Sequence, residues 1–339
     1  MRRIALGVFI LLSWLFLIGA GAAQTAEGEG WPPQTALFND ARFLARAVPF
    51  LIALGIVVGI VQARAASRAA GDAILGDKVR RHDSGILLAH WTNAFGLIVS
   101  LVTGAMILRW TERVLELRLV FVLHYVGAAL MLFAIFNHLA RQGVSGGTDL
   151  LPKRFGVIRD LIGELLEYAG LFGPEGAALR IPWPKAIRQP IARYVRALLG
   201  YTPSQHGKYL TTEKTLSYPP WASLVALVVV TGLIKVLKYI YVIPGPVIAT
   251  TTAIHDLAAI AIGVMLVIHL LPLLFVPANW PLLLSMFKTT VPREYVEKRH
   301  PVWYKQLQAK ASRKVRAAAG DEAGSEQGAT QTTEARTGD

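Results

Sequence analysis

Residues 254–270 read IHDLAAIAIGVMLVIHL, and this stretch decides the fold class of the chain. It is apolar except for His255 and Asp256 near its start and His269 near its end. A helix rises 1.5 Å and turns 100° per residue, so the two histidines are separated by about 21 Å along the axis but only about 40° around it. Both imidazoles are therefore expected on one face of a membrane-spanning helix, one near each surface of the bilayer.

Further apolar stretches approach or exceed the roughly 20 residues that a spanning helix needs. They are Ala47–Ala63, which contains Pro49, Ser84–Leu108, Leu119–Ala140 and Thr215–Ile234. The last apolar stretch runs from Leu257 to Phe287, and Pro272 and Pro277 are expected to kink or end its helix. We expect an all-α membrane protein: a four-helix transmembrane bundle, with helices at about 84–108, 119–140, 215–238 and 250–277, plus one additional N-terminal transmembrane helix.

The composition excludes several other classes of protein. Of the 339 residues, 53% are hydrophobic and only 17% are charged, whereas soluble domains carry about 25% charged residues. The net charge of +13 is attributed to basic loop residues that set the orientation in the membrane, rather than to nucleic-acid binding. Because the chain has no cysteine, it cannot itself hold an iron–sulfur cluster, a thiolate zinc site or a haem attached through C-x-x-C-H.

Both ends of the chain have a distinct composition. A basic start, an apolar middle and small residues near position 23 predict a signal peptide at residues 1–23, with an uncleaved anchor as the alternative. Residues 24–79 would then hold a periplasmic segment and the additional helix. Residues 309–339 are rich in Ala, Gly, Glu, Thr and Gln and are predicted to form a disordered cytoplasmic tail.

The distribution of Lys and Arg predicts the orientation. Residues 64–89 hold five, residues 141–214 hold eleven and residues 288–316 hold nine, while the intervening loops hold two or three each. Basic residues gather on the cytoplasmic side, so the C-terminus and the loop 141–214 are expected there, in a multi-pass protein of the bacterial plasma (inner) membrane. Within that loop the amphipathic segment Ile187–Leu199 is expected to form an interfacial helix.

This orientation also sorts the membrane histidines into pairs. It places His124 and His255 near the outer surface, and His90 and His269 near the inner surface. Each pair offers two imidazoles, and Asp256 is the only acidic residue nearby. Two axial imidazoles fit a low-spin b-type haem, whereas zinc or non-haem iron normally takes a carboxylate or a third histidine. We expect two haem b groups, with these four histidines as the metal ligands.

Some roles stay open at this point. His138 lies 14 residues after His124, so His138 could replace His90 as the inner partner of His269, and spacing alone does not choose between them. Glycines inside the spans either let helices pack closely or leave room for a flat macrocycle. These are Gly104, Gly127, Gly232 and Gly263. The remaining histidines, His82, His206 and His300, are expected in aqueous loops.

A set of short motifs follows in order along the chain. These are Ala89-His90-Trp91, Val102-Thr103-Gly104, Leu123-His124-x-x-Gly127, Gly207-Lys208-Tyr209, Val230-Thr231-Gly232, Ile254-His255, His269 and Arg299-His300-Pro301-Val302-Trp303-Tyr304. With this order and spacing, the chain resembles the cytochrome b (gamma) subunit of membrane-bound formate dehydrogenases over residues 80–308, which we expect to form the dihaem domain. The resemblance implies that His90 and His269 hold the cytoplasmic-side haem, and His124 and His255 the periplasmic-side haem.

The resemblance also implies a function and partners. It implies a membrane anchor that passes electrons from a periplasmic iron–sulfur subunit, joined to a molybdopterin catalytic subunit, through two haems to quinone. The family often reads Asn-x-Gly-Gln-Lys after Gly-Lys-Tyr, whereas this chain reads Leu210–Lys214 as LTTEK, so quinone contacts are not carried over. The alternatives are the b-type cytochrome of a nickel–iron hydrogenase or another periplasmic oxidoreductase, a histidine-relay transporter without haem, and a passive anchor.

Overall fold

The computed structural model describes residues 36–68, 72–146, 150–152, 156–171, 183–200, 206–313 and 316. The predicted signal peptide and most of the predicted tail lie outside these residues, although residues 309–313 continue a helix. The chain divides into two units. The span unit comprises Met1–Ala69, Asp83–Lys153 and Glu213–Phe275, and the loop unit comprises Ala70–His82, Arg154–Thr212 and Val276–Asp339.

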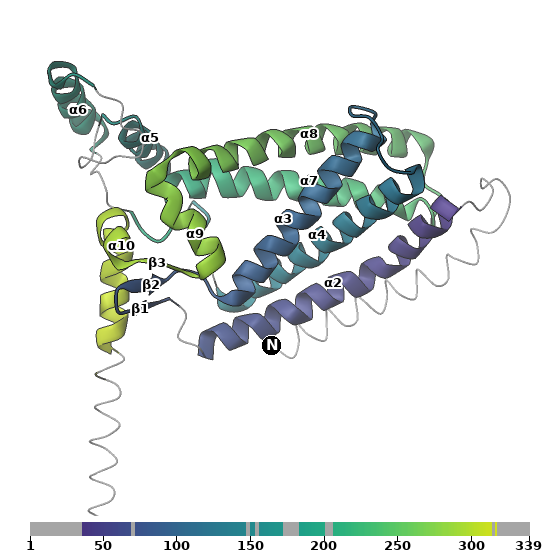
Figure 1. The fold of residues 1–339 in the computed structure, drawn as a ribbon, viewed down its shortest axis with the longest axis horizontal. Helices are drawn as coiled ribbons and strands as arrows, with labels where there is room; N and C mark the ends of the chain where they lie inside the picture. Colours follow the sequence, from purple (N-terminus) through teal and green to yellow (C-terminus); the bar gives the residue numbers. More distant parts are fainter. Residues whose placement is uncertain are drawn as a thin grey trace, which may run out of the picture. The chain divides into compact units, whose positions relative to one another are not determined.

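The span unit consists of long helices (Figure 1). They are α2 (Ala36–Arg68), α3 (Ser84–Ile107), α4 (Leu117–Ser145), α7 (Tyr218–Leu237) and α8 (Gly245–Phe275), with a π-helical turn, Glu213–Ser217, leading into α7. In the described part of the chain, five helices are long and apolar enough to cross a membrane. The prediction of a helical membrane protein with five spans is thereby confirmed.

Two of the spans differ most in extent from the sequence prediction. Helix α2 begins 11 residues before Ala47 and continues through Pro49 without ending. Helix α8 contains Pro272 but stops at Phe275, before an extended Val276 and a short 3₁₀ turn that begins at Pro277. The apolar stretch to Phe287 is therefore two helices, the second being α9 (Trp280–Lys288). The break lies at the extended Val276, whose conformation is the one that a following proline favours.

Four helices of the span unit meet in one apolar cluster. Leu97 of α3, Met131 of α4, Val225 of α7 and Ile262 of α8 pack together, each almost fully buried. Helix α2 joins from outside this cluster, where Ala45 packs against Val236 and Ile240 at the end of α7.

Glycines set the closest helix contacts. A Cβ atom at Gly55 of α2 would lie only 2.6 Å from the carbonyl oxygen of Phe133 on α4, and Gly59 approaches the backbone of Asn137 even more closely. Likewise, a Cβ at Gly96 of α3 would lie 2.7 Å from the carbonyl oxygen of Gly127 on α4. These contacts follow the small-residue packing of membrane helices, and they bind α2 to α4 within the same chain.

The start of α3 is fixed by a charged cap. The Asp83 carboxylate accepts hydrogen bonds from the backbone N–H groups of Gly85 (2.9 Å) and Ile86 (3.1 Å). The same carboxylate pairs with the guanidinium of Arg141 near the end of α4. This cap fixes the register of α3 against α4 and sets the depth of His90, two turns further along.

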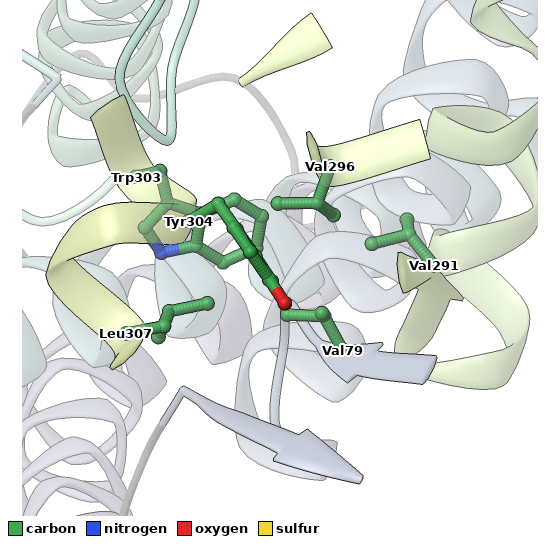
Figure 2. Packing of buried hydrophobic residues seen from close by; sticks show 6 residues of the cluster. All are labelled: Val79, Val291, Val296, Trp303, Tyr304 and Leu307. Carbon is green, nitrogen blue, oxygen red and sulfur yellow. The ribbon is translucent and has the colours of Figure 1, made fainter. Parts of the chain in front are cut away.

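The loop unit contains a small antiparallel sheet, β1 (Ala73–Leu75), β2 (Lys78–Arg80) and β3 (Thr290–Pro292) in that order. It also holds α5 (Val157–Tyr168), α6 (Lys185–Leu199), α9, α10 (Arg293–Arg299) and a helical segment at 301–313. Val79 pairs with Ile74 and with Val291. Figure 2 shows the core that covers the sheet: Val79, Val291, Val296, Trp303, Tyr304 and Leu307. The sequence analysis did not predict this sheet.

Candidate functional site

A cavity of about 470 Å³ lies among the helices of the span unit. Its walls are mostly apolar, and α3, α4, α7 and α8 all contribute to them. Two imidazoles line it, His124 from α4 and His255 from α8, and they lie close enough for electrostatic interaction. Its volume falls in the range of small-molecule and cofactor sites. The structure thus brings together the two histidines that the sequence analysis paired at the outer surface.

The His124 ring is held through one nitrogen. Its Nδ1 lies 3.0 Å from Thr103 Oγ1 and 3.2 Å from the carbonyl oxygen of Ser100. Because a carbonyl oxygen can only accept, Nδ1 must carry the proton. Thr103 is free to accept that proton, since its own hydroxyl donates to the carbonyl oxygen of Val99 at 2.6 Å. In the neutral ring these bonds fix the proton on Nδ1 and leave the lone pair of Nε2 available to a metal.

The His255 ring is held in the same way by a neighbouring helix. Its Nδ1 lies 3.0 Å from Thr231 Oγ1, and the Thr231 hydroxyl donates to the carbonyl oxygen of Leu227 at 2.7 Å. A hydroxyl has one proton, so here too Nδ1–H donates and Nε2 keeps its lone pair. A hydrogen bond at one ring nitrogen that orients the other toward a metal is the usual support of a metal-bound histidine.

The span glycines divide between the two roles left open by the sequence. A Cβ at Gly104 would lie 3.7 Å from His124 Cε1, and one at Gly232 would lie 3.3 Å from His255 Cε1. Both glycines also line the cavity, so their missing side chains leave space beside the imidazoles. Gly127 instead serves helix packing, and a Cβ at Gly263 would meet nothing within 4 Å.

This donor set fits an iron porphyrin. The outer site offers two neutral imidazoles with free Nε2 atoms, an apolar cavity, and glycines where a macrocycle edge would need room. Both histidines were predicted as ligands from the sequence, whereas Thr103 and Thr231 appeared only as members of short motifs, with no role assigned to them. Their signal was the Val-Thr-Gly motif, which occurs once on α3 and once on α7.

The histidines of the inner pair, His90 and His269, have fewer contacts that orient their rings. His90 of α3 and His269 of α8 interact electrostatically, so the fold brings them near each other. The His90 ring meets Trp91 edge-on at 5.4 Å between centroids, and the His269 ring lies 6.1 Å from that of Trp221. Neither imidazole makes a hydrogen bond within the residues that the structure describes, in contrast to the outer pair.

His138 has a different partner. Its Nε2 lies 2.9 Å from the hydroxyl of Tyr218 at the start of α7, and the two rings are 5.9 Å apart. The nitrogen that would bind iron is therefore engaged in a bond between α4 and α7.

The three remaining histidines belong to the loop unit and lie outside the five candidate spans, as predicted, but their side chains are not exposed to solvent. His82, His206 and His300 are all buried. His300 Nδ1 donates to the carbonyl oxygen of Gly207 at 2.7 Å. This bond joins the Gly207-Lys208-Tyr209 motif to the motif that begins at Arg299. Burial, helped by the nearby Arg81 guanidinium, lowers the pKa of His300 to about 3, so this ring is neutral. The His206 and His300 rings thus join distant segments of the loop unit.

Comparison with known proteins identifies the family. A family model described as prokaryotic cytochrome b561 matches residues 81–289, which include His90, His124, His255 and His269. No curated protein matches the chain. Since the family match covers more than half of the sequence, the chain belongs to the prokaryotic cytochrome b561 family, and it is a multi-pass bacterial membrane cytochrome that carries haem b and transfers electrons.

Proposed function

We propose that the chain holds two haem b groups in a four-helix dihaem bundle and serves as the membrane anchor of a quinone-reducing oxidoreductase. His124 and His255 would hold the outer haem, and His90 and His269 the inner haem. When bound, the two haems supply a one-electron path across the bilayer. The observation that carries this proposal is the outer cavity, where two threonines from neighbouring helices hold two imidazoles with their Nε2 atoms free.

The contacts of His138 favour His90 over His138 as the partner of His269. His138 Nε2 is hydrogen-bonded to the Tyr218 hydroxyl, whereas the His90 ring has no hydrogen bond among the described residues and lies within electrostatic range of His269. This supports His90, in agreement with the sequence resemblance. The apolar cluster that joins α3, α4, α7 and α8 would hold both sites in one rigid frame.

The electron donor would be another protein. Since this chain has no cysteine, iron–sulfur clusters that feed the outer haem would belong to a separate periplasmic subunit. The sequence motifs favour a formate dehydrogenase, with a molybdopterin catalytic subunit. The family match supports the b-type cytochrome of a nickel–iron hydrogenase equally well, so that partner is the second candidate. Quinone would be reduced on the cytoplasmic side, where the C-terminus is also expected.

Single variants of the full-length protein test the ligand assignment. His124→Ala and His255→Ala should each remove the same one of two haem components from the reduced spectrum, and His90→Ala and His269→Ala should each remove the other. His138→Ala is the matched control and should retain both. If His138→Ala removes the inner component while His90→Ala keeps it, the inner assignment is wrong.

The donor and acceptor are tested in native membranes. Formate should reduce the haem iron, seen as the appearance of the α-band, if the partner is a formate dehydrogenase. Hydrogen should do so if the partner is a hydrogenase. A soluble quinone analogue should then reoxidise the haem iron, so that the α-band disappears. A purified chain with no Soret band would instead support the histidine-relay transporter or the passive anchor.

A further inference from the structure

Helix α6 of the loop unit is strongly two-sided and has no buried side chain. Ile187, Ile191, Tyr194 and Leu198 recur at intervals of three and four residues and form one apolar face. They are exposed, Tyr194 by 76% and Leu198 by 75%. The opposite face carries the basic residues Lys185, Arg188, Arg193 and Arg196, and residues 183–200 contain no Asp or Glu.

Helix α5 exposes apolar side chains and buries charged ones. Ile158, Ile162 and Leu165 lie on one face and are exposed, Ile158 by 62%. The carboxylates on the other side are buried, Glu164 by all of its surface and Glu167 with 1% exposed. An exposed apolar face opposite buried charges is the reverse of the usual pattern for a soluble surface helix.

The buried carboxylates of α5 are fully engaged inside the loop unit. Glu164 accepts hydrogen bonds from the backbone N–H of Thr211 (2.6 Å) and from the Thr212 hydroxyl (2.6 Å). Glu167 lies 3.1 Å from His206 Nε2 and 3.5 Å from the Arg299 guanidinium. These bonds fix which side of α5 faces the protein, so its apolar side is held outward.

Helices α5 and α6 are tied together. The Trp183 indole N–H, just before α6, donates to the carbonyl oxygen of Ala169 at the end of α5 (2.8 Å). At the other end of α6, a Cβ at Gly200 would lie 3.9 Å from the guanidinium of Arg159 on α5. The two exposed apolar faces therefore belong to one structural element.

We propose that the α5–α6 element docks on an anionic phospholipid bilayer, with its apolar side chains at the acyl boundary and the basic face of α6 at the phosphate headgroups. A basic amphipathic helix with an aromatic residue at its edge is suited to this interface. The element lies between two spans in the sequence, since α4 ends at Ser145 and α7 begins at Tyr218, so a bilayer is always within reach. Each basic side chain near an anionic surface strengthens binding about fivefold.

Charge favours lipid over a protein partner. A protein that covered α6 would have to present an acidic rim around an apolar groove, whereas an anionic leaflet provides negative headgroups above an apolar layer without any specific design. The inference does not depend on haem or on the electron donor.

The absence of cysteine allows a direct test in the full-length chain. Single nitroxide labels would be placed at Ile191→Cys and Ile162→Cys on the apolar faces, with Arg193→Cys on the basic face of α6 as the matched control. Leu257→Cys, on an exposed position of α8, gives the reading for a lipid-facing site. Each chain is reconstituted in nanodiscs of phosphatidylcholine with phosphatidylglycerol, and accessibility to oxygen and to a water-soluble nickel complex is measured.

The expected result is a high oxygen-to-nickel ratio at positions 191 and 162, close to that at 257, and a low ratio at 193. The ratio at 191 should fall in pure phosphatidylcholine discs, and also when Lys185, Arg193 and Arg196 are all changed to Glu. Equal nickel access at 191 and 193 in anionic discs would overturn the proposal. Exclusion of both reagents at 191 would overturn it too, because the face would then be covered by protein, either a partner or a second copy.

Discussion

Replacing Thr103 with valine is the sharpest perturbation of the outer site. Thr103 is 3% exposed, and valine has nearly the same shape, so the helix contact between α3 and α4 is retained. The change removes the acceptor that lies 3.0 Å from His124 Nδ1 and the bond to the carbonyl oxygen of Val99. The imidazole keeps only the Ser100 carbonyl oxygen, at 3.2 Å, as a partner for its Nδ1–H.

The size of the effect follows from this geometry. Loss of a partner that orients a metal-bound histidine costs about 10- to 100-fold in metal affinity. Because the Ser100 carbonyl remains, we expect the lower end, about tenfold, or about 1.4 kcal/mol. A hydrogen bond from Nδ1–H makes the imidazole more basic and so favours ferric iron. If the tenfold loss falls on the ferric state alone, the midpoint potential of the outer haem rises by about 59 mV.

The assay is a spectroelectrochemical titration of the full-length protein, with both haem components resolved. The outer midpoint should rise in Thr103→Val and in Thr231→Val, while the inner midpoint stays constant. Thr103→Ser keeps the hydroxyl and should retain the wild-type midpoint potential. Thr251→Val, at another buried threonine of the bundle, should leave both midpoint potentials unchanged. An unchanged outer midpoint in Thr103→Val, with both haems retained, would show that the hydroxyl does not support a haem ligand.

Three further predictions concern other parts of the molecule. Gly232→Ala places a methyl group 3.3 Å from His255 Cε1 and should lower outer haem content, whereas Gly263→Ala, which meets nothing within 4 Å, should not; equal losses would refute this reading. His138→Ala removes one hydrogen bond at 2.9 Å and should lower stability by about 1 kcal/mol in thermal unfolding, with both haems kept. For His300, whose pKa falls from 6.5 to about 3 on folding, the unfolded chain binds more protons between these values, so stability should fall as pH drops from about 6.5 to about 3. His300→Gln should flatten that part of the stability curve, and an unchanged slope would contradict it.

The membrane fold was predictable because a bilayer demands a minimum apolar length. That requirement located each of the five candidate spans in the described residues. The expectation that His255 and His269 share one face rests instead on the 100° turn per residue of a helix. The bounds were less certain, because apolar length does not show where a helix stops. Only the local geometry at Val276 and Pro277 separates α8 from α9.

What the sequence could not supply were contacts between distant segments. The hydrogen bond from His124 Nδ1 to the Thr103 hydroxyl depends on the register of α3 against α4. The Asp83 cap and the Gly96–Gly127 contact determine that register only in the folded structure. The sheet was missed because its strands have three residues each, too few for a pattern. The burial of Glu164 and Glu167 has no signal in the local sequence, because it depends on partners some 40 to 130 residues further along.

The most direct measurement of the central claim is the haem content of the purified wild-type chain, by pyridine haemochrome spectroscopy against the polypeptide concentration. The account predicts two haem b groups per chain, each with the electron paramagnetic resonance signal of low-spin iron between two imidazoles. One haem per chain would mean that only one histidine pair binds iron. A chain without haem would contradict both proposed sites.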